Sequence, residues 1–145
     1  MKIALKKGFT LIELLVVIAI IGILTAVVLA NLTSAKAKSR DAKRISDLAQ
    51  LQLALTLVFD KCNEYPASIA IDDTICTVNE TAYKLSSFIT KIPTDPSSGS
   101  EYAYFRSNDK FDYRIQAGLE TGGTTGVTSN VGSSACGSNY CVSPR

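Results

Sequence analysis

The sequence predicts an α+β fold in which one long N-terminal α-helix packs on a small antiparallel β-sheet. An apolar stretch, residues 9–32, is followed by residues that contain no Gly or Pro as far as position 61, so one helix can run through both. Residues 101–106 and 111–119 alternate apolar and polar side chains around residues 107–110, which is typical of a β-hairpin. From Thr121 to Tyr140, fifteen of twenty residues are Gly, Ser, Thr or Asn, so the tail has little capacity to form a core.

The first part of the predicted helix, residues 9–32, is a candidate membrane span. As a helix it would be about 36 Å long, enough to cross a bilayer of about 30 Å. The basic residues before it, Lys2, Lys6 and Lys7, predict a cytoplasmic N-terminus and an exported C-terminal part. A second basic run opposes this orientation, because it lies just beyond the other end of the span: Lys36, Lys38, Arg40, Lys43 and Arg44. The cysteines and the polar tail favour export.

Glu13 is the most unusual residue of this segment, because it is the only charged side chain between Lys7 and Lys36. A carboxylate in the hydrocarbon region costs about 2.5 kcal/mol or more, so it indicates a functional site and a cationic partner. Residues 9–32 contain no such partner.

The composition excludes several classes of function. The 145 residues have room for one domain, and a net charge of +2 gives no indication of a dedicated nucleic-acid surface. The chain has no histidine and four widely spaced cysteines, which leaves few arrangements for a metal centre or an activated nucleophile. We therefore expect no catalytic residues, no metal site and no cofactor.

Residues 6–13, Lys-Lys-Gly-Phe-Thr-Leu-Ile-Glu, together with the apolar run that follows, resemble the processing signal of type IV pilins and type II secretion pseudopilins. The resemblance implies a leader peptide of residues 1–8, cleavage between Gly8 and Phe9 by a prepilin peptidase, and N-methylation of Phe9. It also implies the missing partner, because the new Phe9 amine of a neighbouring subunit can pair with Glu13 as the helices stack. The alternative is a polar residue tolerated near the membrane face.

Two further positions of the helix bear on this resemblance. Gly22 matches a glycine at which the helix of family members can loosen in the filament, or it permits close packing of helices. Ala30 stands where the family usually has proline, so we expect an uninterrupted helix there. The resemblance extends, less specifically, through residues 41–55 to Glu64-Tyr65-Pro66.

Residues 33–61 are predicted to form the amphipathic half of the helix. The apolar stripe consists of Ala42, Ile45, Leu48, Leu51, Leu55 and Val58, and it is widened by Leu53, Leu57 and Phe59. We expect one face to cover the sheet and another to contact neighbouring subunits. The basic run 36–44 is interpreted as a solvated helix face, with acidic neighbours or anionic lipid headgroups as alternatives. The helix should end near Cys62, because Asn63 and Pro66 follow.

Residues 62–120 are predicted to form a globular head, and residues 121–145 a disulfide-tethered tail. The head begins with a connector that contains a short helix at Glu80–Ile89, and continues with a rigid turn, Lys91–Pro96. A similar Pro-x-Asp-Pro loop precedes the sheet in pseudopilins. The apolar faces of the hairpin would pack on the C-terminal half of the long helix.

The cysteines and two short motifs give further expectations. Close neighbours in sequence are Cys62 with Cys76 and Cys136 with Cys141, but four cysteines allow three connectivities, and reduced thiols remain an alternative.

Major pseudopilins often bind calcium in the loop corresponding to the tail, but only Glu120 supplies a carboxylate nearby, so we expect no calcium site. Asn31-Leu32-Thr33 and Asn79-Glu80-Thr81 match the N-glycosylation pattern.

The predicted function is that of a structural subunit of a type IV pilus-like filament. The expected partners are further copies of the chain, the prepilin peptidase and methyltransferase, an assembly platform with its ATPase, and the cytoplasmic membrane before assembly. The alternatives are a major pseudopilin of type II secretion, a minor tip subunit, or a membrane-anchored binding module for DNA or surfaces. Nucleic acid would be a partner only through DNA uptake. We expect a single-pass cytoplasmic membrane protein that then enters an extracellular or periplasmic filament, and the cysteine-bounded tail favours the pilus narrowly over the secretion filament.

Overall fold

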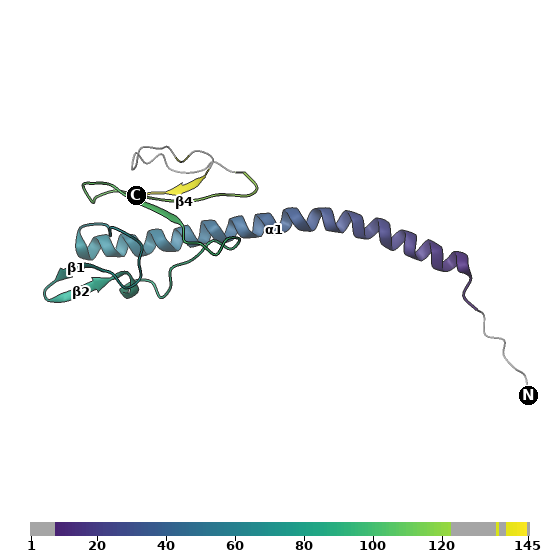
Figure 1. Ribbon diagram of the computed structural model, residues 1–145, viewed down its shortest axis with the longest axis horizontal. Coiled ribbons are helices and arrows are strands. Elements are labelled where there is room, and N and C mark those ends of the chain that lie inside the picture. Colours follow the sequence, from purple (N-terminus) through teal and green to yellow (C-terminus); the bar gives the residue numbers. More distant parts are fainter. Residues whose placement is uncertain (1–7, 123–135, 137–138, 145) are drawn as a thin grey trace, which may run out of the picture. The chain divides into compact units, whose positions relative to one another are not determined.

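The computed structural model describes residues 8–122, 136 and 139–144 (Figure 1). Its largest element is helix α1, Leu11–Cys62, which is 52 residues long and is accompanied by small antiparallel sheets. The predicted α+β fold class is therefore confirmed. The chain divides into two compact units, Met1–Lys36 and Ala37–Arg145.

The N-terminal unit consists of the first turns of α1 and the residues that precede them. The large apolar side chains between Phe9 and Leu32 are exposed, and Leu11 retains 81% of its accessible surface. The helix that begins in this unit is long and apolar enough to cross a membrane, with a mean hydropathy of 3.0 in its most apolar window. The helix also continues through Ala30, as the absence of proline predicted.

In the second unit, α1 buries one face and exposes the other. Leu48, Leu51, Leu55 and Val58 are fully buried in the hydrophobic core. Ala42 and Ile45, at the N-terminal end of the predicted stripe, are exposed, so the buried part of the stripe begins at Leu48. Leu53 and Leu57 are also exposed, whereas Phe59 packs against the core.

The helix ends at Cys62, as the following residues predicted. Asn63 adopts a φ of 53°, and its N–H donates to the Phe59 carbonyl at 2.8 Å. Asparagine tolerates this left-handed conformation better than most residues, so it can terminate a helix in the way that glycine often does.

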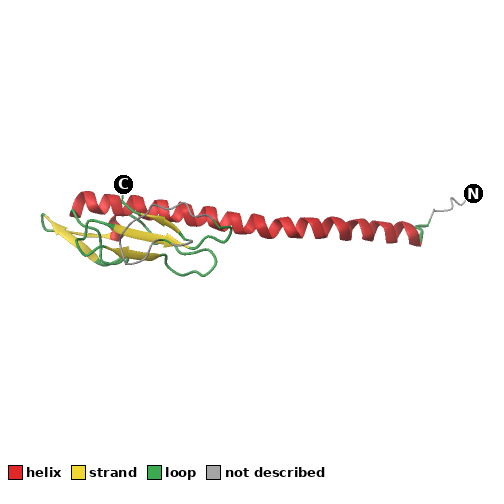
Figure 2. Ribbon diagram, turned by 90° about the horizontal axis from the view of Figure 1, so that it is seen from above, coloured by secondary structure: helices red, strands yellow, loops and turns green. Residues whose placement is uncertain are grey.

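A three-stranded antiparallel sheet with the order β3-β4-β5 covers the buried face of α1 in this unit (Figure 2). Its strands are β3, Ala103–Arg106, β4, Tyr113–Ala117, and β5, Tyr140–Val142. The hairpin between β3 and β4 is the predicted one, with Tyr104 opposite Ile115. The side of the sheet that joins the core carries Tyr113, Ile115, Ala117 and Val142, and Tyr102, which precedes β3, is buried in the same core.

Residues 74–87 contradict the predicted short helix at Glu80–Ile89. They form the strands β1, Thr74–Val78, and β2, Thr81–Lys84, which pair antiparallel, followed by a short 3₁₀ helix, η1, Leu85–Ser87. Asn79 and Glu80 have positive φ angles and reverse the chain between the strands, which removes the N-terminal turn that a helix at Glu80 would need. Thr81 and Tyr83 are residues that favour strands.

The structure contains two disulfides, Cys62–Cys76 and Cys136–Cys141, so the expectation of disulfide bonds is confirmed. The first joins the C-terminal end of α1 to β1, with 5.7 Å between the two Cα atoms. The second joins Cys136 to β5, with a Cα separation of 6.2 Å. Most of the predicted irregular tail, residues 123–135, 137 and 138, lies outside the described residues, but Tyr140 belongs to β5 and Cys141 and Val142 are buried.

The two faces of α1 predict different responses to truncation. Leu51→Ala should lower the free energy of unfolding by about 2–5 kcal/mol, because it opens a cavity in the core. Leu53→Ala removes the same atoms from a side chain that is 63% exposed, and should change stability by less than about 0.5 kcal/mol. Urea denaturation of both variants of the full chain in detergent micelles, followed by tyrosine fluorescence, measures the difference. Equal losses would contradict the assignment of faces.

Candidate functional site

The first candidate site lies at the start of α1, where Glu13 closes a capping box with Thr10. The Thr10 N–H and the Thr10 hydroxyl donate to Glu13 Oε2 at 2.9 and 2.6 Å, and the Glu13 N–H donates to Thr10 Oγ1 at 3.3 Å. A helix begins with N–H groups that lack partners within it, and this reciprocal pair satisfies two of them. The interpretation of Glu13 from the sequence missed this role, although Thr-x-x-Glu before an apolar run is the known pattern for it.

The capping box gives the Glu13 carboxylate two hydrogen-bond donors but does not neutralise its charge. None of the ion pairs among residues 8–122, 136 and 139–144 involves this carboxylate. Both hydrogen bonds from Thr10 go to Oε2, while a carboxylate can accept about four. The side chain therefore retains capacity for a cationic donor from outside the described chain.

The other sequence-predicted residues of this unit are exposed. Gly8 and Phe9 precede the helix, and the Phe9 side chain retains 78% of its accessible surface. A Cβ atom built on Gly22 would meet no atom within 4 Å, so no contact with the described residues requires glycine at this position. Both interpretations of Gly22 concern the assembled state.

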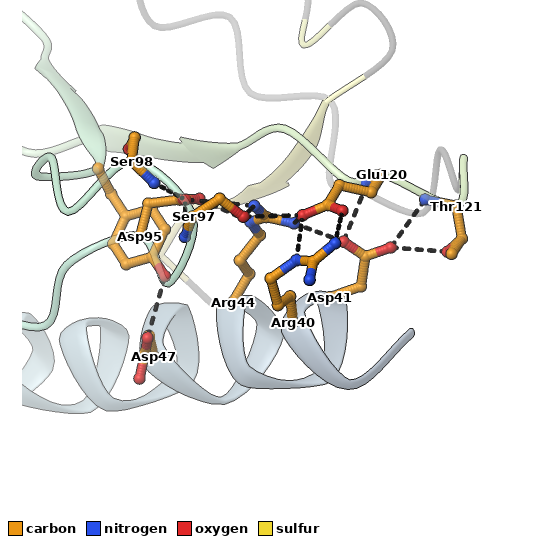
Figure 3. Close-up of polar contacts among 10 residues, drawn as sticks. Arg40, Asp41, Arg44, Asp47, Asp95, Ser97, Ser98, Glu120 and Thr121 are labelled. Carbon is orange, nitrogen blue, oxygen red and sulfur yellow. Dashed lines mark hydrogen bonds and ion pairs between the residues drawn. The ribbon is translucent and has the colours of Figure 1, made fainter. Parts of the chain in front are cut away.

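The second candidate site is a buried charge cluster around Arg44, which is 3% exposed (Figure 3). Its guanidinium donates to Asp95 Oδ2 at 2.6 Å, to Asp41 Oδ1 at 2.7 Å and to Ser97 Oγ at 2.8 Å. It also forms an ion pair with Glu120 at 2.8 Å, and Arg40 binds the same carboxylate. The cluster thus joins α1 to the loop after Pro93 and to the segment that follows β4.

The carboxylates of the cluster also bind backbone N–H groups. Asp41 accepts from the N–H groups of Glu120 and Thr121, both at 2.9 Å. Asp95 accepts from the N–H groups of Ser97 and Ser98 at 2.8 and 3.0 Å. Each acid therefore orients a loop as well as pairing a charge, which is the arrangement that a buried ion pair needs.

A further carboxylate of α1, Asp47, is completely buried. It accepts a hydrogen bond from the Tyr102 hydroxyl at 3.0 Å and an ion-paired bond from Lys43. Burial and the hydrogen bond to Asp47 both raise the pKa of Tyr102 above its usual value, so the phenol stays protonated.

The cluster keeps its acids ionised. The Arg44 guanidinium holds the pKa of Asp95 well below its usual value. Burial opposes ionisation of Asp41, but the hydrogen bonds from Thr121, Glu120 and Arg44 outweigh it and lower its pKa. The Arg40 hydrogen bond, followed by that of Ser97, lowers the pKa of Glu120 to about 2.

This cluster corrects the interpretation of the basic run 36–44 as a solvated helix face. Lys36 and Lys38 are exposed, but Arg44 is buried and Arg40 and Lys43 pair with carboxylates of the same chain. A sequence pattern could have indicated this, because Arg44 precedes Leu48 and Leu51 by four and seven residues and so lies on the core face. Glu120, the one acid near a possible calcium loop, instead binds Arg40, Arg44 and Ser97.

Comparison with known proteins finds similarities that include the start of α1. Residues 3–29 match the family described as the prokaryotic N-terminal methylation motif. The chain is 31% identical to type II secretion system core protein G of Vibrio cholerae serotype O1 over 109 residues, which cover 72% of this chain and 74% of the relative. The core protein G of Escherichia coli K12 is 29% identical over 115 residues, which cover 76% of this chain and 79% of the relative.

A type IV major pilin protein, PilA of Myxococcus xanthus, is 31% identical over 99 residues, which cover 68% of this chain and 36% of the relative. No solved structure matches the chain. The long helix with its small sheets, the methylation motif and these similarities define a class. The chain belongs to the superfamily of type IV pilins and type II secretion pseudopilins, and the core protein G family is among its relatives.

Removal of Arg44 should destabilise the second unit strongly. Arg44→Ala leaves the buried Asp41 and the half-buried Asp95 without their shared cation, so the free energy of unfolding should fall by about 3–5 kcal/mol. Lys38→Ala removes an exposed cation from the same helix and should change it by less than about 0.5 kcal/mol. Urea denaturation of the full chain in micelles checks both values, and a loss below about 1 kcal/mol for Arg44→Ala would refute a central role of the cluster.

The depressed pKa values also predict loss of stability in acid. A carboxylate whose pKa is lower in the folded state stabilises that state above its unfolded pKa, and this contribution is lost as the pH falls through the folded value. For Glu120 the interval runs from 4.5 down to about 2. Glu120→Gln does not titrate there, so its urea midpoint should fall less over this interval than that of the unmodified chain. Identical pH profiles would contradict the contribution of Glu120.

Proposed function

We propose that the chain is the polymerising subunit of a type IV pilus-like filament, assembled through the N-terminal part of α1. The supporting observation is an apolar surface around one acid, within a segment that matches the methylation motif. The side chains from Phe9 to Leu29 that are large and apolar are between 47% and 81% exposed. A surface of this size is stable in contact with lipid or with other helices, but not in water.

The proposed processing releases the partner that Glu13 needs. A prepilin peptidase cuts between Gly8 and Phe9 on the cytoplasmic side, and N-methylation leaves the Phe9 amine cationic. This amine then pairs with Glu13 of the neighbouring subunit, with the Thr10 hydrogen bonds holding the carboxylate at the helix start. Since an isolated charge in an apolar environment is costly, a subunit that leaves the bilayer is stable only in the register that pairs both charges.

The proposal assigns a role to each part of the chain. Residues 1–8 are the leader, 9–32 the membrane span and later filament core, and 33–61 the amphipathic half of the helix. Residues 62–120 form the exported head, and 121–145 the disulfide-tethered tail. Gly22 is proposed to loosen or tighten helix packing in the filament, and the assembly platform, its ATPase and the cytoplasmic membrane are the remaining partners. We propose no catalytic role and no cofactor.

The second candidate function is that of a major pseudopilin in type II secretion. The similarity to core protein G favours this second function, because the similar region covers about three quarters of this chain and of the Vibrio cholerae relative. The two filaments would share the processing and the Glu13 pairing, so both candidates make the same prediction for assembly. A minor tip subunit, or an anchored module that binds DNA or surfaces, would instead be scarce in purified filaments.

Substitution of Glu13 separates charge pairing from helix capping. Glu13→Gln keeps an oxygen that can accept the Thr10 hydrogen bonds but loses the charge, whereas Glu13→Ala loses both. If the charge pairs with the neighbour's amine, both variants should still be cleaved after Gly8 while the filament yield falls at least about tenfold, because a cation is left in an apolar environment. Filaments sheared from cells are quantified by electron microscopy and immunoblotting.

Mass spectrometry of the same filaments should show a methylated Phe9 as the mature N-terminus and this chain as the dominant component. Glu101→Gln neutralises an exposed acid of the head and provides the matched control, which should assemble normally. Normal assembly of Glu13→Gln with failure of Glu13→Ala would show that Glu13 acts as a helix cap alone. Normal assembly of both would refute any role in polymerisation.

A further inference from the structure

The tip of the β1–β2 hairpin presents a short motif that the proposed function leaves without a role. Val78 pairs with Thr81, so Asn79 and Glu80 alone form the turn between the two strands. Their φ angles of 47° and 65° are those of a type I′ turn, which needs positive φ at both positions. All four of these residues are exposed, so the tip projects its side chains to solvent.

The turn requirement explains Asn79 but not the whole motif. Asparagine is one of the few residues that accept a left-handed conformation at low cost, and glycine would be best at the second position. The chain instead has Glu80 there, followed by Thr81, and together they complete the triplet Asn-x-Thr. This triplet is the acceptor pattern for N-linked glycans in exported proteins.

The groups that glycosylation requires are accessible at this tip. Among the hydrogen bonds that the described residues form, none involves the Asn79 amide or the Thr81 hydroxyl. A transferase that must bind both groups together would therefore break no contact with the rest of the head. The hairpin is also a separate two-stranded sheet, not a strand pair inside the three-stranded one.

The second triplet of the chain provides an internal contrast. Asn31 and Thr33 lie within α1, and the Thr33 hydroxyl donates to the Leu29 carbonyl at 3.4 Å. Helical backbone N–H and C=O groups are bonded within the helix, so this triplet cannot open into a turn without local unfolding. Position in the fold thus distinguishes two motifs that the sequence alone presents as equivalent.

We infer that Asn79 is an N-glycosylation site on the exported head. The donor would be an oligosaccharide linked to a lipid through pyrophosphate. The Asn79 amide nitrogen forms a bond to the anomeric carbon of the first sugar and loses one proton, while the bond from that carbon to the phosphate oxygen breaks and the lipid pyrophosphate leaves with the electron pair. The inference rests on the export that the proposed function requires, but not on polymerisation.

The test uses the full chain purified from membranes or filaments of the organism in which it occurs. Intact mass and the masses of proteolytic peptides are measured without reduction, so that each peptide also reports the state of Cys62–Cys76. The peptide containing Asn79 should carry at least one hexose or N-acetylhexosamine, and the peptide containing Asn31 should carry none. Removal of the glycan by an amidase that converts Asn to Asp should leave a mass increase of one unit at position 79.

Matched variants separate a modification site from a structural turn. Asn79→Asp and Thr81→Val should both abolish the mass increment, since one removes the amide and the other the hydroxyl while keeping a β-branched side chain. Thr81→Ser keeps the hydroxyl and should keep the glycan, and Asn31→Gln should change nothing. A glycan that persists in Thr81→Val would overturn the inference.

The state of the disulfide distinguishes failure of this inference from failure of the proposed function. A chain with the Cys62–Cys76 bond and an unmodified Asn79 has been exported but not glycosylated, which overturns only the inference. A chain that is found only in membranes, reduced and unmodified, and never in filaments has not been exported, which overturns both. A glycosylated Asn79 supports the inference whatever the Glu13 variants show about assembly.

Discussion

The guanidinium of Arg44 holds together segments that are distant in the sequence, because it is nearly fully buried and contacts carboxylates from each of them. Asp95, in the loop after Pro93, and Glu120, at the end of the segment after β4, both form ion pairs with Arg44. Asp41, from the same helix, pairs with the guanidinium and also binds the N–H groups of Glu120 and Thr121. The sheet can therefore cover the apolar face of α1 only where these acids reach the arginine, so a buried charge sets the position of a largely hydrophobic contact.

Helix α1 combines two kinds of surface that require different partners. Around Leu51 its apolar side chains are covered by the chain's own sheet, whereas around Leu11 they are exposed in the described chain. Burial of the second surface must come from outside the described chain, and Glu13 is the only charged residue between Lys7 and Lys36. The capping box shows that this acid has one role inside the subunit, and the charge that remains after capping is what a second subunit could use.

Local patterns predicted much of this structure, and long-range contacts account for what they missed. The helix, its end at Cys62 and the β3–β4 hairpin follow from the periodicity of apolar residues and from the helix-ending and turn-forming residues beside them. The partners of Arg44 could not be read in the same way, because Asp95 lies 51 residues away and nothing local shows that they meet. The helix expected at Glu80–Ile89 was wrong, because the chain reverses at Asn79 and Glu80, where both φ angles are positive, and residues on either side of this turn pair as strands. The capping box of Thr10 is different, since its pattern is local and visible in the sequence, but the charge of Glu13 suggested a partner in another subunit first.

The bond between Cys62 and Cys76 has a mechanical consequence for a subunit under tension. It closes residues 62–76 into a covalent ring whose ends stay 5.7 Å apart at their Cα atoms, whereas the same segment as an open chain could extend to about 50 Å. A force that pulls α1 away from the rest of the head cannot extend residues 62–76, because the disulfide fixes the distance between their ends. The load passes instead directly from the end of the helix to β1, so the head yields elsewhere before it lengthens at this point.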